Sequence, residues 1–379
     1  MRTLQSFLQD TWQTGTGTGA SIANAYTGEQ IASASTAGLD LGAALAHARN
    51  VGGPNLRNLS FAERGDLLTA MSGAVHEARE ELIALSIENT GSTRKDAKFD
   101  IDGASGTLAY YGGLGRKLGD SKVLLDGAQV RISRSKRFMG QHIYTPRVGV
   151  AIHINAFNFP AWNMCEKAAS ALLAGMPVMT KPATSTVVTA ERVVRLWVDK
   201  GILPAGALSL MSGSASDLLD HVGGQDCVVF TGSGDTGRKI KSHPQVMANN
   251  VPVNVEADSL NAAVLGPDLA PGDETFDMFL NEVSTEITLK AGQKCTAVRR
   301  ILIPAARLDD ALEGLKDRLD AAVLGDPSER STTVGPLATS SQKRDIEAGI
   351  ATLSETASRV YGDPSAVPES GFHVAPQLF

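Results

Sequence analysis

The chain has few cysteines and no block of like charge. Both features exclude certain classes of protein and binding partner. Its cysteines are Cys165, Cys227 and Cys295, three in 379 residues, an odd and widely spaced set that argues against a disulfide framework and favours a reducing compartment. Lysine and arginine are scattered and the net charge is −6, which speaks against nucleic acid as a partner. No apolar run approaches the roughly 18 residues of a spanning helix, and polar residues interrupt the N-terminus before a signal-peptide core could form. We therefore expect a cytoplasmic protein that makes no membrane contact.

The sequence does hold enough apolar material for more than one core. Hydrophobic residues make up 42% and charged residues 20%, which is ordinary globular composition. Residues 39–89 carry apolar side chains at helical spacing, as in Leu68, Met71 and Val75, and this spacing predicts amphipathic helices. Residues 122–146 instead alternate apolar and polar side chains, which predicts a strand pair protruding from the main body.

From Val148 onward, short apolar strands alternate with helical stretches. The expected strands are residues 148–154, 178–180, 207–211 and 227–231, and the expected helices are residues 161–174, 186–200 and 215–221. A second region follows, with strands at residues 261–265 and 300–304 and helices at residues 277–289 and 308–319. Strand and helix repeated at this spacing indicate βαβ units, so the sequence predicts an α/β fold with a parallel sheet.

Cys295 has the surroundings that a nucleophilic thiol needs. It lies in Lys290-Ala-Gly-Gln-Lys-Cys-Thr-Ala-Val-Arg299, between an expected helix and an expected strand. An exposed position at the end of an element, with cationic or dipolar neighbours, favours the thiolate of a group whose pKa is ordinarily about 8.5. The alternative is a buried cysteine that acts as a small apolar side chain. We adopt that interpretation for Cys165 and Cys227.

Two further segments follow expected strands, where ligands meet a parallel sheet. Asn158 could donate its side-chain amide to a developing oxyanion, and an Asx turn before Pro160 is an equally good interpretation. Phe230-Thr-Gly-Ser-Gly-Asp-Thr-Gly237 is a glycine-containing turn from strand to helix. Amides at a helix N-terminus bind phosphate, although many α/β proteins use glycine there for packing only.

Taken together, these residues resemble the aldehyde dehydrogenase superfamily over essentially the whole chain. The matching blocks, in family order and at family spacing, are Asn158-Phe-Pro160, Lys181-Pro-Ala183, Phe230-Thr-Gly-Ser233 with Gly237, Glu256, and Gly292-Gln-Lys-Cys295 with Ala297. The resemblance implies a Rossmann-like cofactor domain and an α/β catalytic domain whose C-terminal part is missing. It assigns residues 1–121 and 147–256 to NAD(P) binding, residues 122–146 to an oligomerisation hairpin and residues 257–379 to the incomplete catalytic domain. It also implies a homo-oligomer.

The same resemblance implies the roles of the site residues. Cys295 would be the nucleophile, Glu256 the general base that activates water, and Asn158 an oxyanion-hole donor together with the Cys295 backbone amide. The substrate would be a small aldehyde and the cofactor NADP or NAD, with no metal. Lys181 would reach the adenosine ribose, and the other residues expected at the cofactor are Thr184, Gly232, Ser233, Gly237 and Ala257. Lys167 matches a lysine on the proton path of the base, although a solvated helix lysine is an equally good interpretation.

Two departures from the family pattern bear on specificity. Thr184 stands where many members have a glutamate that chelates the ribose of NAD and repels a 2′-phosphate, so we expect NADP to be preferred. Ala257-Asp-Ser-Leu-Asn261 replaces a glycine-rich segment, as in the subfamily that oxidises semialdehydes of CoA thioesters in aromatic degradation. The nearest resemblance is to the dehydrogenase domain of the bifunctional phenylacetate-pathway proteins, which hydrolyse oxepin-CoA and oxidise 3-oxo-5,6-dehydrosuberyl-CoA semialdehyde. The alternative is the 3,4-dehydroadipyl-CoA semialdehyde dehydrogenases of benzoyl-CoA degradation.

A third departure is that the sequence ends at Phe379, whereas family members continue well beyond this point. We therefore expect a fragment of a longer protein, in which a hotdog-fold hydratase domain could follow. Three other functions stay open: a CoA-acylating dehydrogenase, a thiol esterase and a catalytically idle fragment of the same fold. Glu256 argues against the first because transfer to a thiol needs no water base. The cofactor turn argues against the second, and the intact set of Cys295, Glu256 and Asn158 argues against the third.

Overall fold

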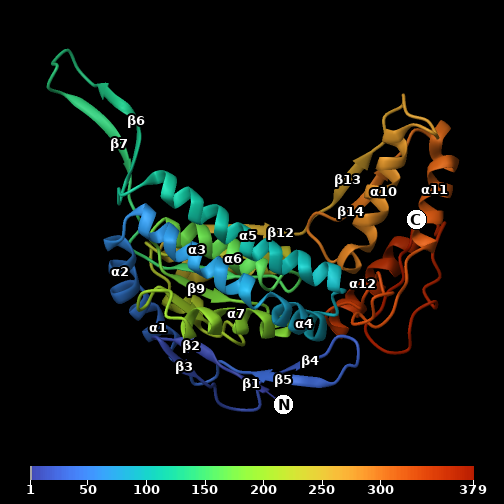
Figure 1. Ribbon diagram of the computed structural model, residues 1–379, viewed down its shortest axis with the longest axis horizontal. Coiled ribbons are helices and arrows are strands. Elements are labelled where there is room, and N and C mark those ends of the chain that lie inside the picture. Colours follow the sequence, from blue (N-terminus) through green and yellow to red (C-terminus); the bar gives the residue numbers. More distant parts are fainter. Residues whose placement is uncertain (1) are drawn as a thin grey trace.

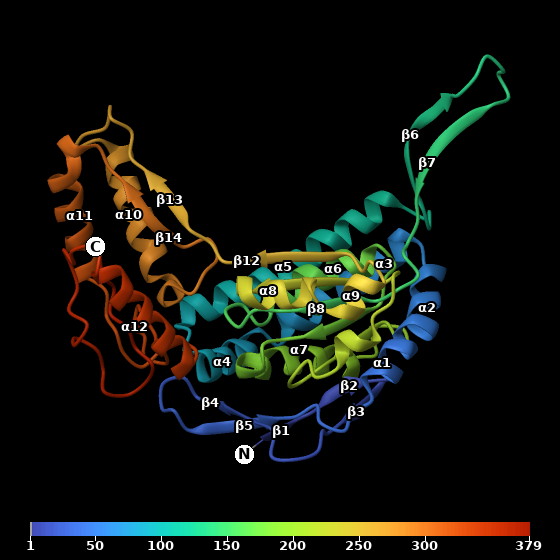
Figure 2. The same cartoon turned by 180° about the vertical axis from the view of Figure 1, so that it is seen from behind.

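The computed structural model describes residues 2–379 and shows an α/β architecture built around one seven-stranded sheet (Figures 1 and 2). The strand order is β12-β11-β8-β9-β10-β2-β3. The strands from β12 to β10 are parallel, and β2 and β3 extend the sheet in antiparallel fashion. The strand bounds are β2 Ser6–Leu8, β3 Thr11–Gln13, β8 Ala151–Ile154, β9 Val178–Lys181, β10 Leu208–Leu210, β11 Cys227–Gly232 and β12 Val253–Ala257.

Helices cover both faces of this sheet, which is why its central strands are mostly apolar. The helices on one face are α3 Phe61–Glu77, α5 Arg94–Leu118, α6 Trp162–Leu173 and α7 Val187–Asp199, and those on the other are α1 Leu41–His47, α8 Gly234–Lys241 and α9 Pro244–Ala248. The helix α3 begins at a capping box in which Ser60 Oγ accepts from the Glu63 amide and the Glu63 carboxylate accepts from the Ser60 amide. Such caps fix where a helix starts.

Smaller elements surround the main body. The strands β1 Arg2–Leu4, β5 Gln30–Ala34 and β4 Ala20–Ala23 form a three-stranded sheet, and α2 Gly53–Asn58 and α4 Arg79–Thr90 complete the helical layer. An antiparallel hairpin of β6 Leu124–Arg131 and β7 Met139–Tyr144 projects from one end of the molecule (Figure 1). Every side chain of β6 is exposed. No helix within residues 2–379 is both long enough and apolar enough to cross a membrane.

A second region lies at the other end of the molecule (Figures 1 and 2). It contains the parallel strands β13 Asn261–Val264 and β14 Val298–Leu302 and the helices α10 Glu274–Thr288, α11 Leu308–Asp320 and α12 Ser340–Ser354. Its own hydrophobic cluster joins Phe276, Leu280, Leu315 and Leu378 among others. The chain enters this region from the edge strand β12 through only the short link at residues 258–260.

Most sequence predictions of secondary structure agree with the structure. The strand pair within residues 122–146 is confirmed, as are the expected strands of the parallel sheet and the expected helices at residues 161–174 and 186–200. The expected helix at residues 215–221 is wrong, because only a short 3-10 helix at Leu218–His221 is present. Ser216 has φ 44°, a left-handed conformation that an α-helix cannot include. The three N-terminal strand pairings, α5 and α12 were not predicted.

Candidate active site

Cys295 lies on a loop with an unusual backbone between α10 and β14. After α10 the chain forms a 3-10 turn, Leu289–Gly292, in which Lys290 and Ala291 have φ 53° and 51°. Cys295 is exposed, whereas Cys165 is buried and Cys227 is half-buried, in line with the apolar roles expected for the latter two. The Asn261 side chain fixes the loop from β13, because its Nδ2 donates to the carbonyl of Cys295 at 2.6 Å.

Glu256 meets this thiol from the edge of the parallel sheet. It lies on β12 opposite Thr231 of β11, and Thr231 Oγ1 donates to Glu256 Oε2 at 3.4 Å. The Glu256 carboxylate acts on the Cys295 thiol. Burial first, and then the negative charge of Glu256, raises the pKa of the Cys295 thiol. The carboxylate therefore opposes ionisation of the resting thiol.

Asn158 is held against the same loop. It follows β8, and its Nδ2 donates to the carbonyl of Gln293 at 2.9 Å, two residues before Cys295. Its Oδ1 accepts from Asn163 Nδ2 at 3.3 Å, in place of the local backbone amide that an Asx turn would supply. Because a side-chain amide carries two N–H donors, one hydrogen fixes the loop and the second is free for another acceptor.

The residues expected at the ribose lie at the end of β9. Lys181 is the last residue of that strand, and its Nζ lies 3.5 Å from Thr184 Oγ1. Thr184 Oγ1 in turn donates to the carbonyl of Gly213 at 2.9 Å. Burial lowers the pKa of Lys181 to about 8. A partly neutralised lysine of this kind would regain its full charge when a phosphate or a polar ribose approaches.

The residues expected at the pyrophosphate form the start of α8. Ser233 is the N-cap residue of this helix, and Gly232 pairs with Ala257 of β12. A Cβ atom on Gly237 would lie 2.7 Å from Val255 Cγ1, so glycine is required there for close packing. The Gly234 amide already donates to the Asp258 carboxylate at 2.9 Å. This helix N-terminus thus binds an anionic group, as helix N-termini that bind phosphate do.

Of the two interpretations of Lys167 that the sequence allowed, the solvated helix lysine does not agree with the structure. Its side chain is only 8% exposed and its Nζ lies 3.1 Å from Glu166 Oε1. His153 of β8 lies on the same side and is fully buried, and burial together with the charge of Lys167 lowers its pKa to about 3. The sequence analysis missed His153, although a histidine inside an otherwise apolar strand was a visible signal.

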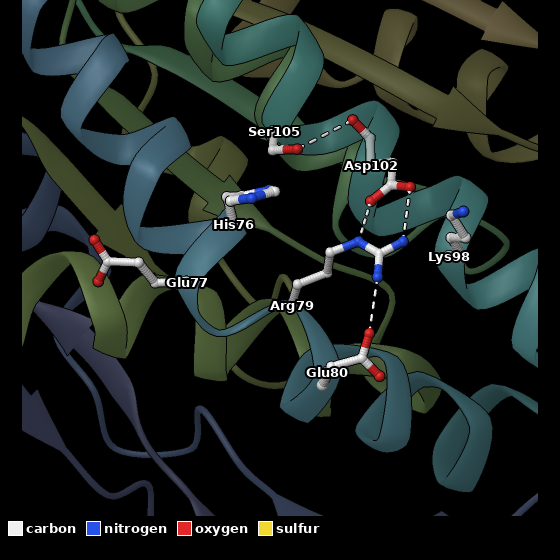
Figure 3. A pocket seen from close by; sticks show the side chains of 7 residues that line it. All are labelled: His76, Glu77, Arg79, Glu80, Lys98, Asp102 and Ser105. Atoms are coloured by element: carbon white, nitrogen blue, oxygen red, sulfur yellow. Dashed lines mark hydrogen bonds and ion pairs between the residues drawn. The ribbon is translucent and has the colours of Figure 1, made fainter.

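A polar groove elsewhere on the molecule is lined by α3, α4 and α5, and Figure 3 shows its side chains. Arg79 bridges Asp102 and Glu80 there, with N–O distances of 2.6 and 2.8 Å. These charges already satisfy one another, and the groove contains neither the thiol nor the strand ends described above. Within residues 2–379, no group of three or more metal-ligating side chains is close enough to hold a metal ion.

Comparison with known proteins identifies the family. The "Aldehyde dehydrogenase family" sequence model matches residues 12–379. The 3,4-dehydroadipyl-CoA semialdehyde dehydrogenase of Aromatoleum evansii is 43% identical over 366 residues, covering 96% of this chain and 71% of that protein. The betaine aldehyde dehydrogenase of Bacillus subtilis is 27% identical, covering 95% of this chain and 72% of that protein. The chain belongs to the aldehyde dehydrogenase family.

Solved structures agree on the fold. The structure of 3,6-anhydro-L-galactose dehydrogenase in complex with NAP superposes with a TM-score of 0.87 at 21% identity, covering 99% of this chain and 77% of that one. The betaine aldehyde dehydrogenase of Staphylococcus aureus in complex with NAD+ gives a TM-score of 0.86 at 24% identity, with 99% and 73% covered. The predicted aldehyde dehydrogenase fold is confirmed. As a family member the protein is an oxidoreductase that acts on aldehydes with NAD or NADP.

Proposed function

We propose that this protein oxidises a CoA-linked semialdehyde to the corresponding acid, with Cys295 as the nucleophile, Glu256 as the base and Asn158 as the oxyanion donor. One observation carries the proposal. The negative charge of Glu256 raises the pKa of the Cys295 thiol, while Asn158 is attached to the Cys295 loop through the Gln293 carbonyl at 2.9 Å. The proposed nucleophile, base and donor amide are therefore grouped around one loop.

The first half-reaction begins with the thiol. The thiol loses its proton to solvent water, and the Cys295 sulfur forms a bond to the carbonyl carbon of the aldehyde. The carbonyl oxygen becomes an oxyanion, which accepts from the free hydrogen of Asn158 Nδ2 and from the Cys295 amide. Bound NAD(P) supplies the acceptor for the hydride that leaves this carbon, so the collapse of the oxyanion yields a thioester on Cys295.

The second half-reaction releases the acid. Glu256 takes a proton from a water molecule, and the water oxygen bonds to the thioester carbon. The C–S bond breaks, and Cys295 leaves as a thiolate while the product leaves as a carboxylic acid. Glu256 must release this proton before the next turnover. Lys167 and His153 are both buried, and we propose Lys167 as a group on that proton path.

The relatives support one substrate over the other. The 43% identical relative bears the name of a 3,4-dehydroadipyl-CoA semialdehyde dehydrogenase, which favours the benzoyl-CoA alternative over the phenylacetate-pathway substrate. We therefore propose 3,4-dehydroadipyl-CoA semialdehyde as the substrate. For the cofactor we propose a preference for NADP, because Thr184 next to the buried Lys181 offers no carboxylate to repel a 2′-phosphate.

The arrangement of elements also supports a division into domains. We propose that residues 1–121 and 147–256 bind the cofactor, that residues 257–379 belong to the catalytic domain and that residues 122–146 mediate oligomerisation. The hairpin exposes apolar side chains that a monomer would leave in water: Leu125, Val130, Ile132, Phe138 and Ile143. Exposed apolar patches of this kind mark protein contacts.

The mechanism is tested by separating its two halves. Cys295→Ala removes the nucleophile, so no hydride should move. Glu256→Gln should still pass through acylation once and then stall, giving about one reduced cofactor per active site and an acyl adduct on Cys295. The measurement is rapid mixing with NADP and a panel of hexanal, adipate semialdehyde and 3,4-dehydroadipyl-CoA semialdehyde, following nicotinamide absorbance and intact mass.

Two results would contradict the assignment of Glu256. Steady turnover like that of the parent would mean that Glu256 is not the deacylating base, and the absence of a burst would mean that the thiol also depends on it. Free CoA added to the stalled adduct is the control. Rapid release of a new thioester would revive the CoA-acylating alternative.

A further inference from the structure

Three charged side chains are buried together beside the proposed site, and the mechanism uses none of them. Asp96 and Asp100 of α5 are 2% and 0% exposed, and Lys290 of the Cys295 loop is 4% exposed. Charged residues are almost never this deeply buried unless they have partners. Replacing such groups by apolar side chains is often neutral or even stabilising. Stability alone is therefore a weak explanation for the cluster.

Asp100 holds the segment that follows Asn158. Its Oδ1 accepts from the Trp162 amide at 2.8 Å, and its Oδ2 accepts from the Ala161 amide at 3.3 Å. These are the N-cap and first residue of the twelve-residue helix α6. A carboxylate at a helix N-terminus is favoured by the helix dipole. The carboxylate thus fixes the end of the Asn158-Phe159-Pro160 segment to α5.

Lys290 contacts the same segment from the opposite side. Its Nζ lies 4.6 Å from the centre of the Phe159 ring, in cation–π geometry, and donates to Ser92 Oγ at 3.1 Å. Burial lowers the pKa of Lys290, while the charges of Asp100 and Asp96 raise it. The Lys290 side chain therefore lies against the aromatic ring next to Asn158 and near the buried carboxyl groups of Asp96 and Asp100.

The main chain of Lys290 connects this cluster to the nucleophile. Its backbone has φ 53°, a left-handed conformation that is uncommon for residues other than glycine. Its carbonyl accepts from Gln293 Nε2 at 3.0 Å. Gln293 is also the residue whose carbonyl accepts from Asn158. One residue is thus connected to the Asn158 segment by its side chain and to the Cys295 loop by its backbone.

We propose that Lys290 is a positioning residue, which together with Asp100 sets the distance between the Asn158 amide and the Cys295 sulfur. This inference rests on the proposed roles of Asn158 and Cys295. An oxyanion donor acts only when it lies within about 3 Å of the place where the charge develops. A displacement of about 1 Å can cost two orders of magnitude in rate. Lys290 touches neither the aldehyde nor the cofactor, and its effect passes through Asn158.

A double-mutant cycle tests this dependence. The rate of the first burst of reduced cofactor is measured for the parent, Asn158→Ala, Lys290→Met and the double variant, with whichever aldehyde of the panel above gives the largest burst. We expect Asn158→Ala to slow acylation by about 10²–10³-fold and Lys290→Met to slow it at least about tenfold. The burst rate of the double variant should be close to that of Asn158→Ala alone. Once the Asn158 amide is removed, losing the residue that positions it has little further effect.

The controls separate positioning from folding. Lys98→Met removes an exposed lysine of α5, the helix that carries Asp96 and Asp100 (Figure 3). We expect this variant to leave the burst rate unchanged. If Lys290→Met does not fold, Lys290→Met with Asp96→Asn takes its place, because this pair removes one positive and one negative buried charge together. Melting temperatures of all variants show whether a slower rate follows a loss of stability.

Two outcomes overturn the inference while leaving the proposed function intact. In the first, Asn158→Ala slows the burst but Lys290→Met does not. In the second, the fold reductions in burst rate of the two single variants multiply in the double variant. This would mean that Lys290 acts independently of Asn158. If Asn158→Ala leaves the burst rate unchanged, the oxyanion role itself is wrong and the inference falls with it.

Discussion

The backbone amide of Gly234 donates to the carboxylate of Asp258 at 2.9 Å. Asp258 follows Glu256 by two residues and has φ 50°, a conformation that is rare outside glycine, asparagine and aspartate. Its carboxylate therefore lies at the N-terminus of α8, where we place the pyrophosphate of the cofactor. A negative side chain and a negative ligand compete there for the same amides.

This competition predicts that Asp258→Asn binds the cofactor more tightly than the parent. The substitution removes the charge but keeps a side chain that tolerates the left-handed backbone. We expect Kd for NADP to fall several-fold in a fluorescence titration, with a weaker dependence on salt. Asp235→Asn, an exposed change on the same helix, is the matched control. A weaker cofactor affinity in Asp258→Asn would mean that the carboxylate supports the site instead of blocking it.

Thr184→Glu should shift the cofactor preference from NADP towards NAD. A carboxylate at this position would repel a 2′-phosphate and could chelate the ribose hydroxyls, and a tenfold shift requires only about 1.4 kcal/mol. The ratio of kcat/KM for NADP and NAD measures the effect. Thr184→Gln provides a neutral side chain of the same size. If the parent already used NAD far better than NADP, the interpretation of the Lys181 and Thr184 pocket would be wrong.

The effect of the Glu256 charge on Cys295 predicts how the thiol reacts with iodoacetamide. Because burial and the charge of Glu256 raise the pKa of the thiol, the thiolate fraction and the alkylation rate should keep rising with pH above the ordinary range for cysteine. Glu256→Gln removes the charge and should make alkylation at neutral pH several-fold faster. Peptide mass mapping assigns the label to Cys295.

Glu166→Gln is the matched control for that experiment. Glu166 also raises the pKa of Cys295, but it is the smallest of the contributions, so its removal should have a smaller effect than that of Glu256. Slower alkylation in Glu256→Gln than in the parent would contradict the prediction. It would show that the carboxylate activates the thiol more than it suppresses the thiolate.

Buried His153 predicts a loss of stability in mild acid. Its pKa is lowered from 6.5 to about 3 by burial and by the charge of Lys167, so the unfolded chain binds a proton that the folded chain does not. The free energy of unfolding should therefore fall as pH falls from about 6.5 towards 3. At about pH 4.5 the loss from this group would be roughly 2–3 kcal/mol, since each pKa unit corresponds to about 1.4 kcal/mol.

Urea unfolding of the parent and His153→Leu at about pH 7 and pH 4.5 measures this contribution. The variant changes the packing at both pH values, so only the difference between the two pH values reports the titration. We expect the parent to lose more stability than the variant on acidification. Equal losses would mean that the folded protein accommodates a charged His153.

The sequence predicted the parallel sheet well because its strands are buried on both faces and read as apolar runs. The helix α5 escaped prediction because its 25 residues include glycines and charged residues around a narrow buried stripe. The N-terminal strands are three to five residues long, too short for a periodic pattern to emerge.

The proposed site residues were predicted from their motifs, whereas the network of contacts around them was not. Asn158 and Gln293 are 135 positions apart, and Lys290 lies 198 positions from Ser92. Contacts of this range depend on how the helices are arranged around the sheet, which no local pattern encodes. In the sequence, Lys290 is a lysine near a cysteine with no further distinguishing feature. Only the fold shows that it is buried, as are Asp96 and Asp100.

The proposed nucleophile and the proposed base belong to different hydrophobic cores. Glu256 lies on the large sheet, whereas Cys295 lies between α10 and β14, whose region is held by the smaller cluster around Phe276, Leu280 and Leu315. A region with less buried apolar surface opens at a lower free energy than the main core. On warming, the enzyme should therefore lose activity before it loses its helical signal. Its working temperature is then set by the smaller region and not by the melting point of the whole fold.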